Sequence, residues 1–156
     1  SLYIAITNKI LIANISNTYT RIQTIAHECL HSVQNKKILM FNFIFSNLYI
    51  LYYILICILA IFKVLPNKLM FLGIYLIFSL VYYMVRIYLE NDAMINAKYL
   101  AKEYMEEIKI SSKEEIDKIV KEFGKINDIG IRCVNYKFFL NIIVKLLIFL
   151  GICIIR

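Results

Sequence analysis

The chain has 156 residues, of which 61% are hydrophobic, and carries 18 Lys and Arg against 11 Asp and Glu, a formal net charge of +7. Its mean hydropathy of +0.69 is too high for an ordinary soluble domain of this length, which indicates a membrane protein. The basic residues lie between the apolar runs, which suits an anionic lipid surface, and no aromatic–basic motif is present. We therefore expect a lipid bilayer, and no nucleic acid, as a partner.

The N-terminal segment predicts a β-hairpin. Two short stretches rich in β-branched residues, Tyr3 to Ile6 and Lys9 to Ala13, flank the turn-forming pair Thr7-Asn8. The sequence begins with Ser1 rather than Met, inside this strand pattern. We therefore expect that an N-terminal segment precedes it, for example a further membrane helix.

A helix is predicted from about Tyr19 to Asn35. The sequence Ser16-Asn17-Thr18 is an N-cap cluster, and neither Gly nor Pro interrupts the residues that follow. Six apolar residues fall at helical spacing and form one stripe: Ile22, Ile25, Ala26, Cys29, Leu30 and Val33. Three polar residues, His27, His31 and Gln34, lie along the edge of this stripe and face a different way.

This helix holds the only two histidines of the chain in the pattern HExxH, residues 27–31. Residues four apart share a helical face, so His27 and His31 can present two imidazoles to one metal ion. Glu28 is rotated by about 100°, where it can take a proton from water that the metal activates, as in metallopeptidases. The alternative is a pair of buried or interfacial histidines on a core helix, and a third ligand decides between the two.

Two long apolar runs predict a transmembrane helical hairpin. Leu39 to Phe62 is uncharged and long enough to span a bilayer, and Leu69 to Leu89 is a second span if Arg86 extends its charge to the interface. The connecting KVLPNK, residues 63–68, contains the only proline and predicts a tight turn. Lys and Arg are more numerous on the motif side than in this turn. The positive-inside rule therefore places the motif at the cytoplasmic face of a multi-pass protein of the cell membrane.

The third ligand is expected directly after the second span. A catalytic zinc site takes three protein ligands and keeps a fourth position for water, so a carboxylate should join the two histidines. Most carboxylates lie in the charged stretch 103–128, whereas Glu90 and Asp92 stand apart. Two membrane crossings return the chain to its starting side, so Glu90 can meet His27 and His31. Asp92 can hold a ligating imidazole through its free N–H. The alternative for Glu90 is a polar cap of a membrane helix.

The helix of the second span is expected to continue to about Ile108, and a further amphipathic helix follows it. Ser111 and Ser112 each have a glutamate three residues later, which is a capping-box pattern. This helix is expected to end near Phe123 at Gly124, and KINDIG, residues 125–130, predicts a loop.

A third apolar run, Phe138 to Ile155, predicts a third membrane helix. Lys145 lies at its centre, where a charge in lipid is costly, so its ammonium should face a partner or water. The alternative is a helix that lies against the bundle or in the interface, with Lys145 on its wet side.

Taken together, these features resemble a family, the bacterial membrane-bound neutral zinc metallopeptidases of the YugP type, which are gluzincin-like HExxH enzymes. IAHECLHSVQ, residues 25–34, resembles the family's AAHEVGHAIQ, and ENDA, residues 90–93, resembles its EFDAS, with the membrane hairpin between them. Two positions depart from the pattern: Leu30 replaces a small residue, and Met94 stands where serine is common. The spacing of the glutamate and aspartate separates the chain from the HtpX-like and prenyl-protein-processing enzymes.

The resemblance implies one Zn²⁺ per chain, held by His27, His31 and Glu90, with Glu28 as general base. We therefore expect a mainly α-helical integral membrane protein, with a single domain over residues 1–156. The expected activity is that of a zinc endopeptidase that cleaves a protein or peptide substrate at the cytoplasmic face. Tyr136, next to the last apolar run, is our choice of oxyanion donor among 12 tyrosines.

Two other classes of protein stay open. One is a catalytically inactive scaffold or binding protein that keeps the peptidase fold, against which the intact Glu28 argues. The other is a membrane hairpin protein with a fortuitous or structural metal site. No feature of the sequence specifies an oligomeric state.

Overall fold

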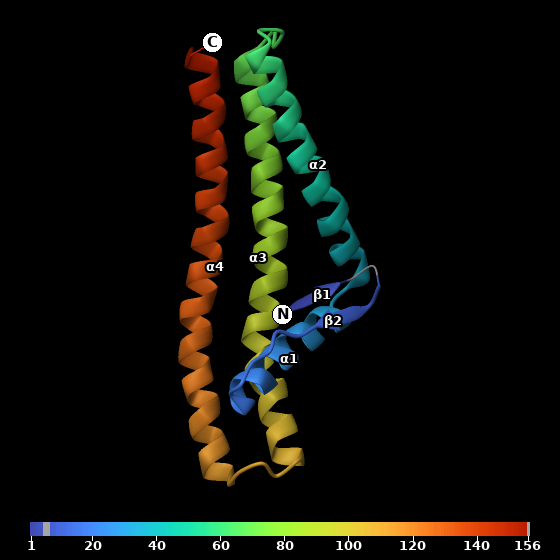
Figure 1. Ribbon diagram of the computed structural model, residues 1–156, viewed down its shortest axis with the longest axis vertical. Coiled ribbons are helices and arrows are strands. Elements are labelled where there is room, and N and C mark those ends of the chain that lie inside the picture. The colour runs from blue at the N-terminus through green and yellow to red at the C-terminus, as the bar shows by residue number, and fades with distance from the viewer. Residues whose placement is uncertain (5–6, 156) are drawn as a thin grey trace. The chain divides into compact units, whose positions relative to one another are not determined.

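A computed structural model describes residues 1–4 and 7–155 of the chain. Within these residues the protein is mainly helical, as predicted, and follows the order β1 (Leu2–Ile4), β2 (Lys9–Leu11), α1 (Thr18–Val33), α2 (Lys36–Ile61), α3 (Lys68–Glu107) and α4 (Lys113–Ile155) (Figure 1). Ala5, Ile6 and Arg156 lie outside the described residues, so the predicted end of the first strand at Ile6 does too.

The predicted N-terminal hairpin is confirmed, with shorter strands. Strand β1 pairs antiparallel with β2, in a register that sets Leu2 opposite Leu11 and Ile4 opposite Lys9. Asn8 has a φ of 51°, in the left-handed region that asparagine tolerates better than most residues. The Tyr3 hydroxyl donates to Asn8 Oδ1 over 3.0 Å, which ties the strand to this turn.

Helix α1 begins where the capping pattern predicts. Asn17 is the N-cap, and its Oδ1 accepts from the Thr20 backbone N–H at 2.9 Å and from the Thr20 hydroxyl at 3.1 Å. The helix ends at Val33, two residues before the predicted Asn35. A backbone bond from the Gln34 N–H to the Leu30 carbonyl closes its last turn.

Three helices, α2, α3 and α4, are long and apolar enough to cross a membrane, as a multi-pass membrane protein requires. Helix α2 ends at Ile61, and Lys63 follows in the left-handed conformation with a φ of 60°, which is a common way to end a helix. Pro66 lies in the connection, and α3 begins at Lys68. The predicted tight turn between the first two apolar helices is therefore present.

The chain divides into two compact units, and α2, α3 and α4 each contribute to both. The first unit comprises Ser1–Leu39 and Tyr88–Cys133, and the second comprises Met40–Ile87 and Val134–Arg156. Each unit has its own buried cluster of apolar side chains.

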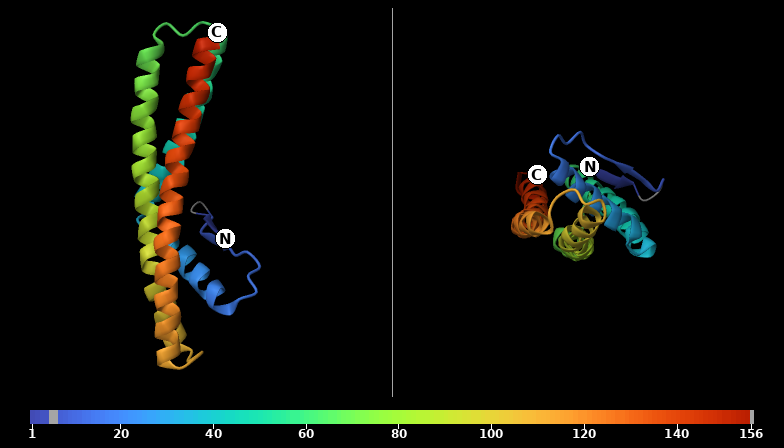
Figure 2. Two further views of the ribbon diagram at one scale, coloured as in Figure 1. Left: turned by 90° about the vertical axis from the view of Figure 1, so that its left-hand side faces the viewer. Right: turned by 90° about the horizontal axis from the view of Figure 1, so that it is seen from below.

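The core of the first unit is built on small side chains. Within it, α1 lies across α3 rather than alongside it (Figures 1 and 2). Every fourth residue of α3 is almost fully buried here, in the stripe Leu89, Ala93, Ala97, Ala101 and Met105. Ala26 of α1 and Ile116 of α4 join this cluster. Because alanine has only a methyl group, the backbones of α1 and α3 can approach closely.

The core of the second unit is aromatic. Buried side chains of α2, α3 and α4 meet in this cluster, among them Ile56, Tyr75 and Phe149. The rings of Tyr49 and Tyr75 stack with centroids 5.7 Å apart, and their hydroxyls hydrogen-bond over 3.0 Å. Ser79 donates to the Tyr75 carbonyl at 2.8 Å. The buried hydroxyls are therefore paired with one another or with backbone carbonyls, as an apolar environment requires.

The predicted helix end at Gly124 and the predicted loop over residues 125–130 are wrong, because α4 continues without interruption from Lys113 to Ile155. Packing against α3 explains the difference. Asn127 donates from Nδ2 to the Met94 carbonyl at 2.8 Å, and a Cβ added at Gly130 would lie 2.6 Å from the Met94 side chain. No described glycine has a positive φ. Gly130 therefore allows close approach of two helices, and this contact outweighs the weak helical propensity of the segment.

Gly124→Ala should leave the stability of the protein unchanged or raise it by up to about 1 kcal/mol, because alanine is the better helix former. The added Cβ would lie 3.8 Å from Lys98 Nζ, an ordinary contact. Thermal unfolding in detergent, followed by circular dichroism, measures the change. Gly73→Ala is the control, since it lies inside α3 with no atom within 4 Å of the added Cβ. A loss of about 1 kcal/mol in Gly124→Ala alone would indicate a helix end at this position.

Candidate metal centre

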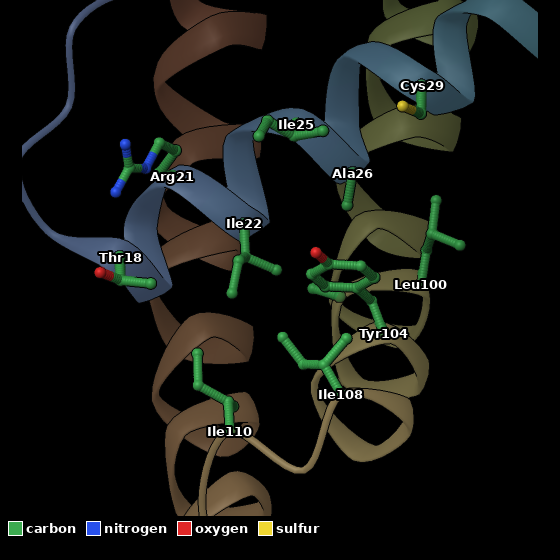
Figure 3. A pocket seen from close by; sticks show the side chains of 11 residues that line it. Thr18, Arg21, Ile22, Ile25, Ala26, Cys29, Leu100, Tyr104, Ile108 and Ile110 are labelled. Carbon is green, nitrogen blue, oxygen red and sulfur yellow. The ribbon is translucent and has the colours of Figure 1, made fainter.

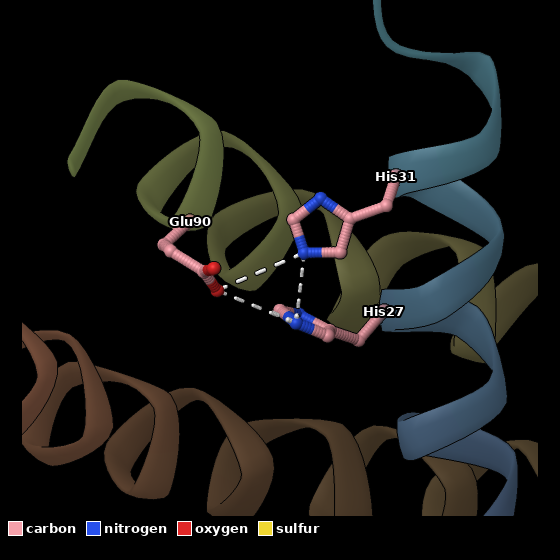
Figure 4. A group of neighbouring side chains, drawn as sticks. All are labelled: His27, His31 and Glu90. Atoms are coloured by element: carbon pink, nitrogen blue, oxygen red, sulfur yellow. Dashed lines mark hydrogen bonds and ion pairs between the residues drawn. The ribbon is translucent and has the colours of Figure 1, made fainter. Parts of the chain in front are cut away.

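Helix α1 presents two imidazoles to one carboxylate of α3. The side chains of His27 and His31 point toward Glu90 in Figure 4, and the two Nε2 atoms are 3.2 Å apart. Glu90 Oε2 lies 3.8 Å from His27 Nε2 and 3.7 Å from His31 Nε2. The three side chains are 24%, 12% and 18% exposed for His27, His31 and Glu90, so the group is screened from water but open on one side.

The spacing of these three atoms fits a transition-metal ion. A circle through the two Nε2 atoms and Oε2 has a radius of about 2.1 Å, close to zinc–nitrogen and zinc–oxygen bond lengths of about 2.0–2.2 Å. Among the residues that the structure describes, this is the one group of three His, Cys, Asp or Glu side chains that could hold a metal ion. Two imidazoles and a carboxylate are donors that divalent transition metals accept.

Glu28 lies next to this group without belonging to it. It follows His27 on α1 and is only 6% exposed, which is unusual for a carboxylate. Its negative charge favours the protonated form of both His27 and His31, which shows that its carboxylate lies within electrostatic reach of both rings. Glu28 is thus a buried acid beside a set of three metal-type donors.

Gln34 fixes the tautomer of His31. Its Nε2 donates to Asp92 Oδ2 and to the Leu89 carbonyl, each at 2.8 Å. The opposite end of the amide, Oε1, lies 2.9 Å from His31 Nδ1 and can only accept, so Nδ1 carries the proton. The lone pair of His31 is then on Nε2, the atom that faces His27 and Glu90.

The electrostatics of the two histidines differ. Burial lowers the pKa of His27 below its ordinary value, and His31 lowers it further, against the opposing effects of Glu90, Glu28 and the Ala93 backbone. Burial alone would also lower the pKa of His31, but Glu90 and Gln34 outweigh it and the pKa is raised. In the metal-free protein the two rings therefore take up protons at different pH values, His31 first as the pH falls.

The predicted site residues are placed as follows. His27, His31 and Glu90 come together, as the topology of the membrane hairpin led us to expect, and the role of each as a ligand stays a prediction. Asp92 reaches His31 only through Gln34, whose place in the network we did not predict. A signal for it existed, because Gln34 lies three residues after His31 on the same helical face.

The predicted oxyanion donor, Tyr136, belongs to the second unit, where its side chain is 65% exposed. Its role therefore stays a prediction from the sequence.

A separate apolar pocket lies on the opposite face of α1, within the first unit (Figure 3). It has a volume of about 510 Å³ and is bounded by apolar side chains of α1, α3 and the connection to α4, among them Ile22, Ile25, Leu100, Ile108 and Ile110. Helical spacing places Ile22 and Ile25 well away from the imidazoles of His27 and His31. The pocket is therefore distinct from the metal-type group.

Comparisons with protein-family models, with curated proteins and with solved structures find no match to this chain. The resemblance described from the sequence thus rests on its motifs alone.

Replacing Gln34 with alanine should lower the pKa of His31 in the metal-free protein, because the hydrogen bond from Nδ1–H to the amide oxygen raises it. The two histidine resonances, followed by NMR during a pH titration in detergent, measure this change. Gln23→Ala removes an amide from the same helix and should leave the pKa of His31 in place. An unchanged His31 in Gln34→Ala would contradict the assignment of the tautomer.

Proposed function

We propose that the protein is a membrane zinc peptidase that hydrolyses peptide bonds of a protein or peptide substrate. The observation that carries this proposal is the meeting of His27 and His31 with Glu90 at 3.2–3.8 Å, beside a buried Glu28. The HExxH motif supplies two ligands and a base, and Glu90, directly after the second apolar run of the sequence, supplies the third ligand. The resemblance to the YugP-type peptidases gives the same assignment.

In this proposal, His27 and His31 hold the ion through Nε2 and Glu90 holds it through a carboxylate oxygen. When bound, zinc supplies a Lewis acid that polarises the substrate carbonyl and activates water near neutral pH. A fourth position has to stay open for this chemistry. The partial exposure of the His27 side chain leaves a route from solvent to the ligand atoms.

Glu28 is the proposed general base. Its carboxylate takes a proton from the attacking water and passes it to the nitrogen of the leaving amine. Glu28 lies on the same helix as the two imidazoles, and its burial keeps bulk solvent from competing for that proton. An inactive scaffold would need no buried carboxylate at this position, and so the burial of Glu28 favours the enzyme.

Gln34 and Asp92 act as positioning residues. The hydrogen bonds from Asp92 through Gln34 to His31 hold the imidazole ring with Nε2 directed at the metal position. The Nε2 lone pair can then bind a metal ion without rotation of the ring. The density of basic residues around the start of α2, where Lys36 and Lys37 lie, supports a cytoplasmic location for the site.

Four proteins purified in detergent test the proposal: the wild type, Glu90→Ala, Glu28→Gln and Glu103→Ala. Zinc per chain is measured by atomic emission, and hydrolysis is measured with fluorescein-labelled casein. We expect about one zinc in the wild type and in Glu28→Gln, and much less in Glu90→Ala, which lacks a ligand. Hydrolysis should fall by at least about 100-fold in Glu28→Gln, since the amide cannot accept the proton.

Glu103→Ala is the matched control, because Glu103 is an exposed carboxylate of the same helix, α3. It should retain both zinc and activity. Equal zinc content in Glu90→Ala and the wild type would exclude Glu90 as a ligand. Zinc bound with full hydrolysis in Glu28→Gln would exclude Glu28 as the base.

A further inference from the structure

The apolar run of α4 carries a polar stripe that the metal-type group does not use. Asn141 and Lys145 are the two hydrogen-bonding side chains in an otherwise aliphatic and aromatic stretch, residues 138–155, apart from the thiol of Cys153. They lie four residues apart and so share one face of the helix. Asn141 is exposed and Lys145 is partly buried. Polar side chains in a membrane helix mark the face that meets another polar surface.

Lys145 contacts aromatic rings but no anion. Its Nζ lies 4.6 Å from the ring centroid of Tyr49 and 5.7 Å from that of Tyr53. The Tyr53 hydroxyl donates to the Lys145 backbone carbonyl at 3.1 Å, so its hydrogen bond is to the backbone of that residue. Among the residues that the structure describes, no carboxylate forms an ion pair with Lys145. The ring faces compensate the charge in part, and three N–H donors need acceptors.

The unit that contains Lys145 cannot supply the missing charge. Residues 40–87 and 134–156 include no Asp or Glu in the sequence. A second copy of this unit would bring further basic residues and no carboxylate. Because no described carboxylate of the chain pairs with Lys145 either, we look for the counter-charge of the ammonium in a different molecule.

The depth of Lys145 decides what kind of molecule this is. Lys145 lies near the middle of its apolar run, about 10 Å from the nearer end at a rise of about 1.5 Å per residue. Lipid phosphates lie outside the hydrocarbon core, whereas a side chain of another transmembrane helix can be placed at any depth. A carboxylate carried by such a helix matches both the charge and the depth.

We infer that the Asn141–Lys145 face of α4 binds a transmembrane helix of another protein that presents an Asp or Glu opposite Lys145. Asn141 provides an amide one turn away for a second hydrogen bond across the interface. Tyr49 and Tyr53 hold the ammonium in place before the partner arrives. The inference does not depend on the metal site, because every residue that it uses belongs to the second unit.

The test uses the full chain in phosphatidylcholine vesicles at pH 8 and synthetic leucine-rich transmembrane peptides with a central Glu or Gln. Energy transfer between labelled protein and labelled peptide measures association. The Glu peptide should bind at least tenfold more tightly than the Gln peptide. Lys145→Met should abolish this preference, whereas Lys145→Arg should retain it. Lys137→Met, an exposed lysine of the same helix outside the apolar run, is the matched control and should retain it too.

Several outcomes would overturn the inference. Equal binding of the two peptides would do so, as would an undiminished preference in Lys145→Met. A third outcome is a preference for spin-labelled phosphatidylglycerol that requires Lys145, with no preference between the peptides, which would make Lys145 a lipid-phosphate site. Circular dichroism and zinc content of Lys145→Met, unchanged from the wild type, show that a lost preference does not reflect misfolding or damage to the metal site.

Discussion

The close approach of α1 and α3 is the constraint on which the candidate site depends. Ala26 packs in one cluster with Ala97 and Ala101, and the buried stripe of α3 contains no bulky side chain between Leu89 and Met105. The imidazoles on α1 meet the Glu90 carboxylate only because the helices are separated by methyl groups. A metal site tolerates displacements of its ligands of only about 0.5 Å. A larger residue in this stripe would therefore move the imidazoles of α1 away from the Glu90 carboxylate, although all three ligand side chains would still be present. The small alanine side chains between α1 and α3 therefore set the distance between the imidazoles and the carboxylate.

Each unit handles its polar groups differently. In the first unit, Gln34 satisfies three partners at once, and the network from Asp92 to His31 leaves one lone pair directed at the metal position. In the second unit, buried tyrosine hydroxyls bond to one another and to backbone carbonyls. Lys145 is the departure from this pattern, and such departures from local consistency are where function is expected.

Local signals made much of the fold predictable. The Asn17 cap and the apolar spacing defined α1, and hydropathy defined the apolar helices, because both depend on residues near in sequence. The meeting of Glu90 with the two histidines was predictable because two membrane crossings return the chain to the side on which it started. The spacing of Gln34 from His31 signalled their contact, but the bonds of Gln34 to Leu89 and Asp92 were not predictable, because they depend on which residues of α3 face the amide. The helix through residues 124–130 was not predicted, because the glycines and the asparagine of this segment are weak helix formers. Their neighbours Met94 and Lys98 belong to α3, so the packing that favours the helix cannot be seen in the local sequence.

The central claim is that two imidazoles and one carboxylate form a zinc site. X-ray absorption at the zinc edge of the metal-loaded protein tests it most directly, because it reports the type, number and distance of the ligand atoms. The account predicts two imidazole nitrogens and one or two further oxygens at about 2.0–2.2 Å, with no sulfur. A sulfur shell at about 2.3 Å, or a shell without imidazole scattering, would contradict the site formed by His27, His31 and Glu90.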